Sequence, residues 1–342
     1  MSFIHNLKHP IIGLAPIDGV TDCAYREIVD KYSKPSIMFT EFIPIEGLMR
    51  GATKLLHSFH RHKSKTPIIG QVFGVNEISF YNAFFIVAEM GLDGIDVNMG
   101  CPDRGLIKRG GGAGLILNPK QARQLIHTLK EARNDWQNGK QISDTLLPKE
   151  ILTAILTYKK QNNIIPKRKT FSVSVKTRIG FDKPITKKWI SYLLDAEPDL
   201  ITIHGRTFKQ LYTGKADWEE IQKAVKLAYK SKTQMWGNGD ISSMGQAKEY
   251  IKTYDVDGIL VGRAAFGNPW FFGENKPTLK TKFQVMLEHA KLYLKYRPEM
   301  SIAPLRKHFC WYCSGFPGYG KVREKLMKAL TINEIKNIVD II

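Results

Sequence analysis

The sequence predicts an α/β fold, a (β/α)8 TIM barrel followed by a small all-helical domain. Eight short apolar runs recur before residue 273, amphipathic segments separate most of them, and a polar side chain lies at the end of nearly every run. A doubly wound open sheet would also alternate strands with helices. The repeated polar position favours the barrel, because the chemistry of such barrels gathers at the C-terminal ends of the strands.

The eight runs are rich in Val, Ile and Leu without strict alternation, which is typical of parallel strands covered on both faces. Strands are predicted at 11–17, 37–42, 67–73, 94–98, 171–177, 200–204, 234–238 and 258–261. Apolar residues at helical spacing predict the crossover helices. They include 77–90, 119–133, 217–230 and 243–253.

Two segments depart from this repeat. The stretch 134–170 is a long insertion between the fourth and fifth strands, with one extra helix expected near 148–161. From 273 onward the strand pattern is absent, and helical periodicity is found at 282–296, 303–314, 321–330 and 332–341. We therefore expect a catalytic barrel domain over 1–272 and a helical domain over 273–342.

Composition limits the cellular setting. Four cysteines, Cys23, Cys101, Cys310 and Cys313, are too few for a disulfide framework in 342 residues. The Cys310-x-x-Cys313 pair has no second pair at zinc-ligand spacing, so we predict no metal site. No apolar run approaches the ~20 residues that span a bilayer, and no signal peptide is evident. We expect a cytoplasmic protein without membrane contact.

The charge favours a polyanionic partner. The formal net charge is +19, from 51 Lys and Arg against 32 Asp and Glu. The excess is marked in the tail, where residues 276–342 hold 13 basic and 5 acidic residues. The alternative is a Lys-rich proteome in the source organism.

The segment 94–102 resembles a catalytic strand end. A short apolar run leads directly into Asn98, Cys101 and Pro102, and glycines follow at 110–112 and 114. A thiol beside such a permissive loop is typical of an active site. The alternative is a buried and inert cysteine, because free Cys is often fully buried.

The last two strand ends resemble a phosphate site. Gly237-Asn238-Gly239-Asp240 follows the seventh strand and Gly262-Arg263 follows the eighth, where barrels commonly bind phosphate. Glycine lets backbone N–H groups approach an anion, and an Arg side chain adds a charged fork. We therefore expect a cofactor that bears phosphate.

Three further strand-end residues bear on which cofactor this is. Gln71, Lys176 and His204 would surround the barrel mouth with an amide, a cation and an imidazole. A flavin needs such groups along its pyrimidine edge, where reduction builds negative charge. Lys176 could instead form a Schiff base. With Arg178 beside it and Cys101 near, a flavin is the favoured interpretation.

The whole set of motifs resembles the tRNA-dihydrouridine synthase family. The resemblance covers residues 11–272 and resumes in the tail. No single motif is specific to the family, but the set of motifs in this order along the chain is. The matching segments are 15–22, 96–102, 175–180, 204–207, 212–218, 237–241, 261–265, 306–308, 311–312 and 315–318. Ile17 stands where the family usually has Met, and the insertion is longer than expected.

The resemblance implies an FMN-dependent barrel followed by an RNA-binding helical domain. It implies Cys101 as the proton donor, and Asn98, Arg178 and Tyr212 near the target uracil. The residues it implies for FMN are Pro16, Ile17, Asp18, Gln71, Lys176, His204, Asn238, Gly239, Asp240, Gly262 and Arg263.

The expected reaction is reduction of the C5=C6 bond of a uridine in the D-loop of tRNA, with NADPH or NADH as the electron source. Hydride would add at C6, and Cys101 would protonate C5. We expect a monomer without an obligate protein partner. An FMN-dependent reductase of a free pyrimidine is the alternative, but it would not need a basic tail. A tRNA-binding module without catalysis would not need an intact Cys101 motif.

Overall fold

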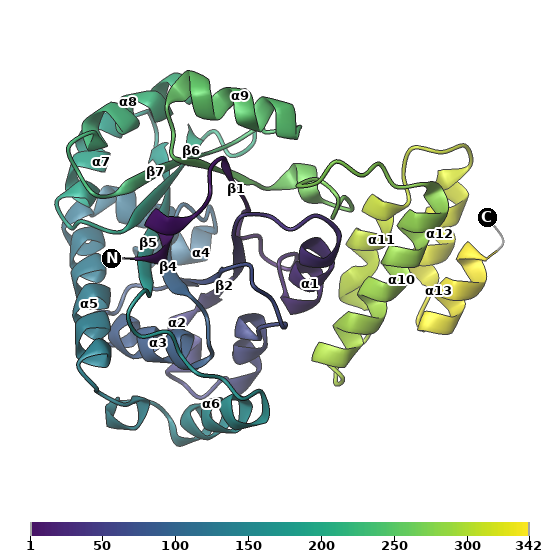
Figure 1. The fold of residues 1–342 in the computed structure, drawn as a ribbon, viewed down its shortest axis with the longest axis horizontal. Helices are drawn as coiled ribbons and strands as arrows, with labels where there is room; N and C mark the ends of the chain where they lie inside the picture. Colours follow the sequence, from purple (N-terminus) through teal and green to yellow (C-terminus); the bar gives the residue numbers. More distant parts are fainter. Residues whose placement is uncertain (1, 341–342) are drawn as a thin grey trace.

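The computed structural model describes residues 2–340. Eight parallel strands form a closed barrel in which each strand pairs with the next along the chain and β8 pairs with β1 (Figure 1). This confirms the predicted TIM barrel. The strands are β1 (Ile11–Leu14), β2 (Met38–Pro44), β3 (Ile68–Phe73), β4 (Gly94–Met99), β5 (Ser172–Gly180), β6 (Leu200–Thr207), β7 (Gln234–Asn238) and β8 (Gly258–Val261).

Helices surround this barrel, and a group of four follows it. Around the barrel are α1 (Cys23–Tyr32), α2 (Ile45–Leu48), α3 (Glu77–Glu89), α4 (Arg104–Lys108), α5 (Pro119–Gln137), α6 (Lys149–Gln161), α7 (Thr186–Leu194), α8 (Trp218–Ala228) and α9 (Met244–Tyr254). The tail forms α10 (Leu279–Tyr296), α11 (Arg306–Tyr312), α12 (Tyr319–Lys328) and α13 (Ile332–Val339). Short 3-10 turns are η1 (Phe3–Asn6), η2 (Thr53–Phe59), η3 (Gly112–Leu117), η4 (Ile142–Asp144), η5 (Arg263–Ala265) and η6 (Ala303–Leu305).

Several predicted boundaries were wrong by a few residues. β1 ends at Leu14 instead of 17, since Pro16 has no N–H with which to continue the ladder. β5 and β6 run three residues further than expected, because polar residues continue the pairing at the barrel mouth. α5 continues to Gln137, and its last turns bury Trp136 against Phe84 and Phe171.

The insertion packs on one side of the barrel through its predicted helix, α6. Tyr158 stacks on His60, with ring centroids 4.5 Å apart and an interplanar angle of 7°. Lys159 forms an ion pair with the buried Glu89 of α3, and Lys167 pairs with Asp93 at 2.9 Å. The basic residues that flank α6 therefore partly serve to fix the insertion to the barrel.

The group of tail helices packs against α1 mainly through α10. Ala24 and Ile28 of α1 and Trp270 belong to the same apolar cluster as Phe283, Met286 and other tail residues. At the edge of this contact, Lys31 of α1 pairs with Glu288 of α10 at 2.5 Å. Figure 1 shows the four helices as a separate group beside the barrel. Among residues 2–340, no helix combines the length and apolar composition that a membrane span requires.

A histidine of α10 lies in this contact without a hydrogen-bond partner. His289 is fully buried between Tyr25, His308 and Tyr312, and neither of its ring nitrogens is paired within the described chain. Burial lowers the pKa of His289 to about 3. The folded protein therefore holds a neutral imidazole that the unfolded chain protonates below its usual pKa of about 6.5.

His289→Phe should make folding less sensitive to acid. Because the folded pKa is depressed, stability from the neutral imidazole is present above about pH 6.5 and is lost as the pH falls below it. Between pH 7.5 and 5.5 this loss is about 1.4 kcal/mol, which the variant avoids. Thermal unfolding of both proteins at the two pH values measures the difference. His127→Phe, on the exposed face of α5, is the control. An equal change in melting temperature for wild type and His289→Phe would contradict the prediction.

Candidate active site

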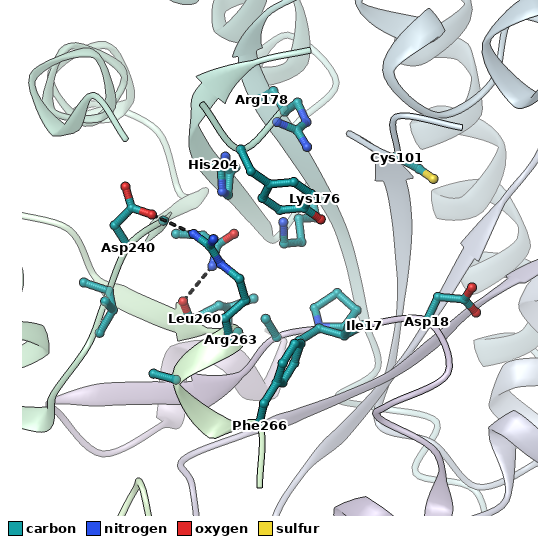
Figure 2. Close-up of a pocket in the computed structure, with 18 of the residues that line it drawn as sticks. Ile17, Asp18, Cys101, Lys176, Arg178, His204, Asp240, Leu260, Arg263 and Phe266 are labelled. Atoms are coloured by element: carbon teal, nitrogen blue, oxygen red, sulfur yellow. Dashed lines mark hydrogen bonds and ion pairs between the residues drawn. The ribbon is translucent and has the colours of Figure 1, made fainter. Parts of the chain in front are cut away.

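A cavity of about 780 Å³ opens at the C-terminal ends of the strands. Figure 2 shows Asp240 and Arg263 at one end of it, Cys101 and Asp18 at the other, and Lys176 and His204 between them. This volume lies in the range of small-molecule and cofactor sites, and the position is the one at which barrels of this type place their chemistry.

Most of the residues predicted for the site line this cavity. They are Pro16, Ile17, Asp18, Cys101, Lys176, Arg178, His204, Tyr212, Asn238, Gly239, Asp240, Gly262 and Arg263. Gln71 and Asn98 do not line it. Gln71 is fully buried and Asn98 nearly so, and both amides hydrogen-bond within the barrel below the cavity.

Several lining residues were not predicted from the sequence. They are Ala15, Phe42, Pro102, Ile241, Ser242, Leu260, Ala264 and Phe266. Most are apolar or small, so their residue types give no indication of chemistry. Phe42 is the last residue of a predicted strand and Ile241 directly follows Asp240, so their position along the chain is the feature that could have identified them.

The loop that carries Cys101 is held by the end of β4. Asn98 Oδ1 accepts hydrogen bonds from the backbone N–H groups of Gly100 at 3.0 Å and Cys101 at 2.8 Å. Arg178 Nε donates to the Gly100 carbonyl at 2.7 Å from β5. Burial raises the pKa of the Cys101 thiol above its ordinary value. The thiol is therefore protonated at neutral pH and can act as a proton donor.

Lys176 and His204 place a cation and an imidazole at the middle of the cavity. Burial, together with the nearby Arg178, lowers the pKa of Lys176 to about 8, so the ammonium form predominates at pH 7. No hydrogen bond to another described residue holds this ammonium. Burial and then the Lys176 charge lower the pKa of His204 well below its usual value. His204 is neutral, and its buried Nδ1 has no partner within residues 2–340.

At the other end of the cavity, Asp240 holds two arginines. Its carboxylate pairs with Arg206 at 2.6 Å and with Arg263 at 2.8 Å, and it accepts from the backbone N–H of Ala216. Burial alone would raise the pKa of Asp240, but the hydrogen bond from Arg206 and the other two partners lower it overall. The carboxylate stays ionised, and the positive charge of Arg263 remains half exposed beside Gly262.

Two aromatic contacts fix the outer wall of the cavity. The Arg263 guanidinium lies 5.2 Å from the ring centroid of Tyr212, whose side chain is largely exposed. Phe266 stacks on Trp311 of α11 with centroids 4.3 Å apart. Phe266 also lines the cavity. Helix α11 therefore contacts the wall of the site through Trp311.

The tail also contacts the rim near Asp18. Gly19 adopts the left-handed conformation, and a Cβ there would overlap Lys307 Nζ. Its N–H donates to Glu41 at 2.8 Å, and Glu41 pairs with Arg297 at 3.1 Å. Burial and Glu41 raise the pKa of Asp18, against an opposing effect of Lys307. The rim at Asp18 and the tail therefore form one connected surface.

No group of three or more His, Cys, Asp or Glu side chains within the described chain has the arrangement of a metal site. Cys313 is buried and Cys310 is half-buried beside Met327, at the end of α11 and outside the barrel.

The fold and the site define a (β/α)8-barrel protein with a protonated thiol and a cationic cavity at its mouth. The model of the dihydrouridine synthase family matches residues 13–137 and 158–341, and the chain belongs to this family. The internal stretch that the model leaves unmatched, 138–157, lies in the insertion and includes most of α6.

Curated relatives agree over nearly the whole chain. A probable tRNA-dihydrouridine synthase of Staphylococcus aureus (strain MRSA252) is 28% identical over 99% of this chain and 95% of its own length. A probable tRNA-dihydrouridine synthase 1 of Synechocystis is 27% identical over 97% of this chain and 86% of its own length. Among solved structures, a histamine dehydrogenase from Rhizobium sp. 4-9 covers 82% of this chain and 49% of its own at 12% identity, with a TM-score of 0.52. That likeness concerns the fold alone.

Proposed function

We propose that this protein is an FMN-dependent tRNA-dihydrouridine synthase, which reduces the C5=C6 bond of a uridine in the D-loop of tRNA with NADPH or NADH. The observation that supports it most directly is the shared cavity. A protonated thiol lies at one end, an unpaired ammonium in the middle and an arginine beside glycine turns at the other end. Membership of the dihydrouridine synthase family agrees with this chemistry.

The cavity residues fit FMN. Within the described part of the chain, no hydrogen bond holds the Lys176 ammonium and a buried ring nitrogen of His204 has no partner, so each has a hydrogen-bonding group left for a ligand. A Cβ added at Gly262 would meet nothing nearer than Ile17 Cδ1 at 3.6 Å, so the backbone there is open to a closely bound group. We assign the phosphate to the residues at 238–240 and 262–263, and the flavin ring to Lys176, His204 and the backbone at 16–18.

Each side chain then has a defined task. FMN supplies the hydride when it is bound and reduced. Lys176 places positive charge where reduction of the ring builds negative charge, and Cys101 holds the proton that the uracil C5 accepts. Arg178 lies beside the Cys101 loop and Tyr212 lies beside Arg263. Both are assigned to the uracil. The base has to leave the folded tRNA to reach them.

The remaining assignments follow from composition and homology. We propose that residues 1–272 form the catalytic domain and that residues 273–342 form the tRNA-binding domain. We also propose that the protein acts in the cytoplasm as a monomer. The rival function, reduction of a free pyrimidine, would use the same cavity, but it leaves unexplained the 13 basic residues of the tail and the direct contact between that tail and the cavity wall.

The test of this function is the visible spectrum of the purified protein. We expect flavin absorption that bleaches with NADPH in the absence of oxygen and returns when an unmodified tRNA transcript is added, but not when free uracil or orotate is added. Recovery with a free pyrimidine would establish the rival function. Absence of flavin absorption after reconstitution with FMN would refute the cofactor assignment.

Neutralising cations of the tail should weaken tRNA binding. Lys307→Gln with Arg323→Gln removes two charges from the tail and keeps side chains of similar length. Each lost phosphate contact lowers the slope of log affinity against log salt by about 0.9 or less. We expect weaker binding and a shallower salt slope, with unchanged bleaching of the flavin by NADPH.

The matched control for this pair is Lys226→Gln with Lys230→Gln. Both residues are exposed, in or just after α8 on the side of the barrel away from the tail (Figure 1). Electrophoretic mobility shifts at several salt concentrations compare the two pairs. Equal effects of the tail and control pairs would show that the RNA surface lies elsewhere or is unspecific.

A further inference from the structure

Asp96 is a buried carboxylate below the cavity for which the proposed reaction has no use. It lies on β4, paired with Gln71 of β3 and Ser174 of β5, and it is fully buried. Ser174 Oγ donates to its Oδ1 at 2.7 Å and Gln71 Nε2 donates to its Oδ2 at 2.6 Å. Burying an acidic group costs free energy unless it is well hydrogen-bonded, so its place inside the barrel requires a reason.

A chain of hydrogen bonds connects Asp96 to the loop of Cys101. Gln71 Nε2 donates to Asp96, and Gln71 Oε1 accepts from Asn98 Nδ2 at 2.9 Å. Asn98 Oδ1 in turn accepts from the N–H groups of Gly100 and Cys101. All the members are buried except the two loop residues at the end.

The direction of this chain is fixed by chemistry. Backbone N–H groups can only donate, so the oxygen of Asn98 must face the loop and its nitrogen must face Gln71. The oxygen of Gln71 then faces Asn98, and its nitrogen faces residue 96. An acceptor is required at that point, and the Asp96 carboxylate supplies one.

We infer that Asp96 is a positioning residue for Cys101, which acts through the oriented amides of Gln71 and Asn98 to fix the loop that carries the thiol. The role in turnover rests on the proposed function, in which Cys101 is the proton donor. Without an acceptor at position 96, the Gln71 amide can rotate, the Asn98 amide loses its fixed orientation, and the two loop N–H groups lose their common acceptor.

The first test compares two substitutions of similar size. Asp96→Leu removes the acceptor. Asp96→Asn keeps an oxygen for Gln71, because its amide nitrogen can donate to the hydroxyl of Ser174. Hydrogen–deuterium exchange of the peptide that contains Gly100 and Cys101 is measured in the full-length protein loaded with FMN. We expect exchange about tenfold faster in Asp96→Leu and close to wild type in Asp96→Asn. Wild-type exchange in Asp96→Leu, or equal acceleration in both variants, overturns the inference.

A second test remains informative if Asp96→Leu does not fold. Gln71→Glu places two carboxyl groups face to face, and Lys176 on β5 is the charged group of the described chain that acts on Asp96. At low pH the pair shares a proton, so Glu at 71 still donates to Asp96 and still accepts from Asn98. At high pH both groups ionise and the chain breaks.

Adding Asp96→Asn to Gln71→Glu supplies a donor opposite the new carboxylate. Relative to wild type at each pH, we expect protection of Gly100 and Cys101 to fall with rising pH in Gln71→Glu and to stay constant in the double variant. A residue that merely fills space at position 96 would give no such rescue. Equal pH dependence in the two proteins overturns the inference.

Turnover gives a separate measurement. If Cys101 is the proton donor, Asp96→Leu lowers kcat about tenfold and leaves KM for tRNA unchanged. Hydrogen–deuterium exchange needs no tRNA, so the positional role of Asp96 and the proposed function can be refuted independently. If Asp96→Leu loses protection but the wild-type protein reduces no tRNA, the proposed function is refuted and the positional role of Asp96 is kept. Normal tRNA reduction with unchanged protection in Asp96→Leu would refute the positional role alone.

Discussion

Cys101→Ala is expected to lower dihydrouridine formation by about 10²- to 10⁴-fold, the usual contribution of a positioned general acid. Burial raises the pKa of the thiol, so the wild-type group is a proton donor throughout the neutral range. Alanine cannot supply the proton, while the backbone hydrogen bond from residue 101 to Asn98 remains. The loss should therefore fall on kcat, with little change in FMN content or tRNA affinity.

The measurement is single-turnover oxidation of reduced enzyme by tRNA, followed at the flavin absorption band. The pH dependence adds a second criterion: because the reacting form is the protonated thiol, the wild-type rate is retained up to the raised pKa and falls as the pH passes it. Cys310→Ala, in a half-buried position on α11, is the control. A Cys101→Ala enzyme with full activity would exclude this thiol as the acid.

The order of the barrel elements and most of the site could be predicted from the sequence because both depend on local patterns. Apolar runs define the strands, and polar residues at or near the C-terminal end of a run reach the barrel mouth whatever the rest of the chain does. Lys176 and His204 illustrate this, since both line the cavity although their strands are longer than predicted.

The direction of individual side chains was not predictable in the same way. Gln71 and Asn98 lie near the C-terminal ends of β3 and β4, but they point to Asp96 and to the Cys101 loop instead of lining the cavity. That outcome depends on the register of three neighbouring strands, which sequence pattern does not specify. The contact of Trp311 with Phe266 could not be predicted from the sequence either. It joins a residue that follows β8 to a residue of α11, 45 positions later in the chain.

The insertion shows a further limit. Its helix was predicted, but its basic residues gave no indication that Lys159 would pair with Glu89 or Lys167 with Asp93. Their partners lie about 70 residues earlier in the chain, so the local sequence could not show that these lysines are paired. Local charge counts therefore overestimate the cations that remain for RNA in this segment.

Lys176→Met is expected to weaken FMN binding by roughly 10- to 100-fold, because a hydrogen bond to a charged group contributes about 1.5–3 kcal/mol. Methionine keeps much of the side-chain length and removes the ammonium. The same loss should fall more heavily on the reduced flavin, whose negative charge the ammonium faces. The two-electron potential should therefore drop by about 30–60 mV.

The sign of the pH effect follows from the lowered pKa of Lys176, which is about 8. Below that pH the ammonium is present and the affinity difference between wild type and Lys176→Met is largest. Above it wild type loses the charge, and the difference shrinks. Fluorescence titration of the apoprotein with FMN from pH 6.5 to 9.5 measures this, and Lys183→Met, at an exposed lysine just after β5, is the control. An affinity difference that does not change with pH would show that the ammonium of Lys176 does not contact the bound flavin, and the cofactor would then have to lie in another orientation within the cavity.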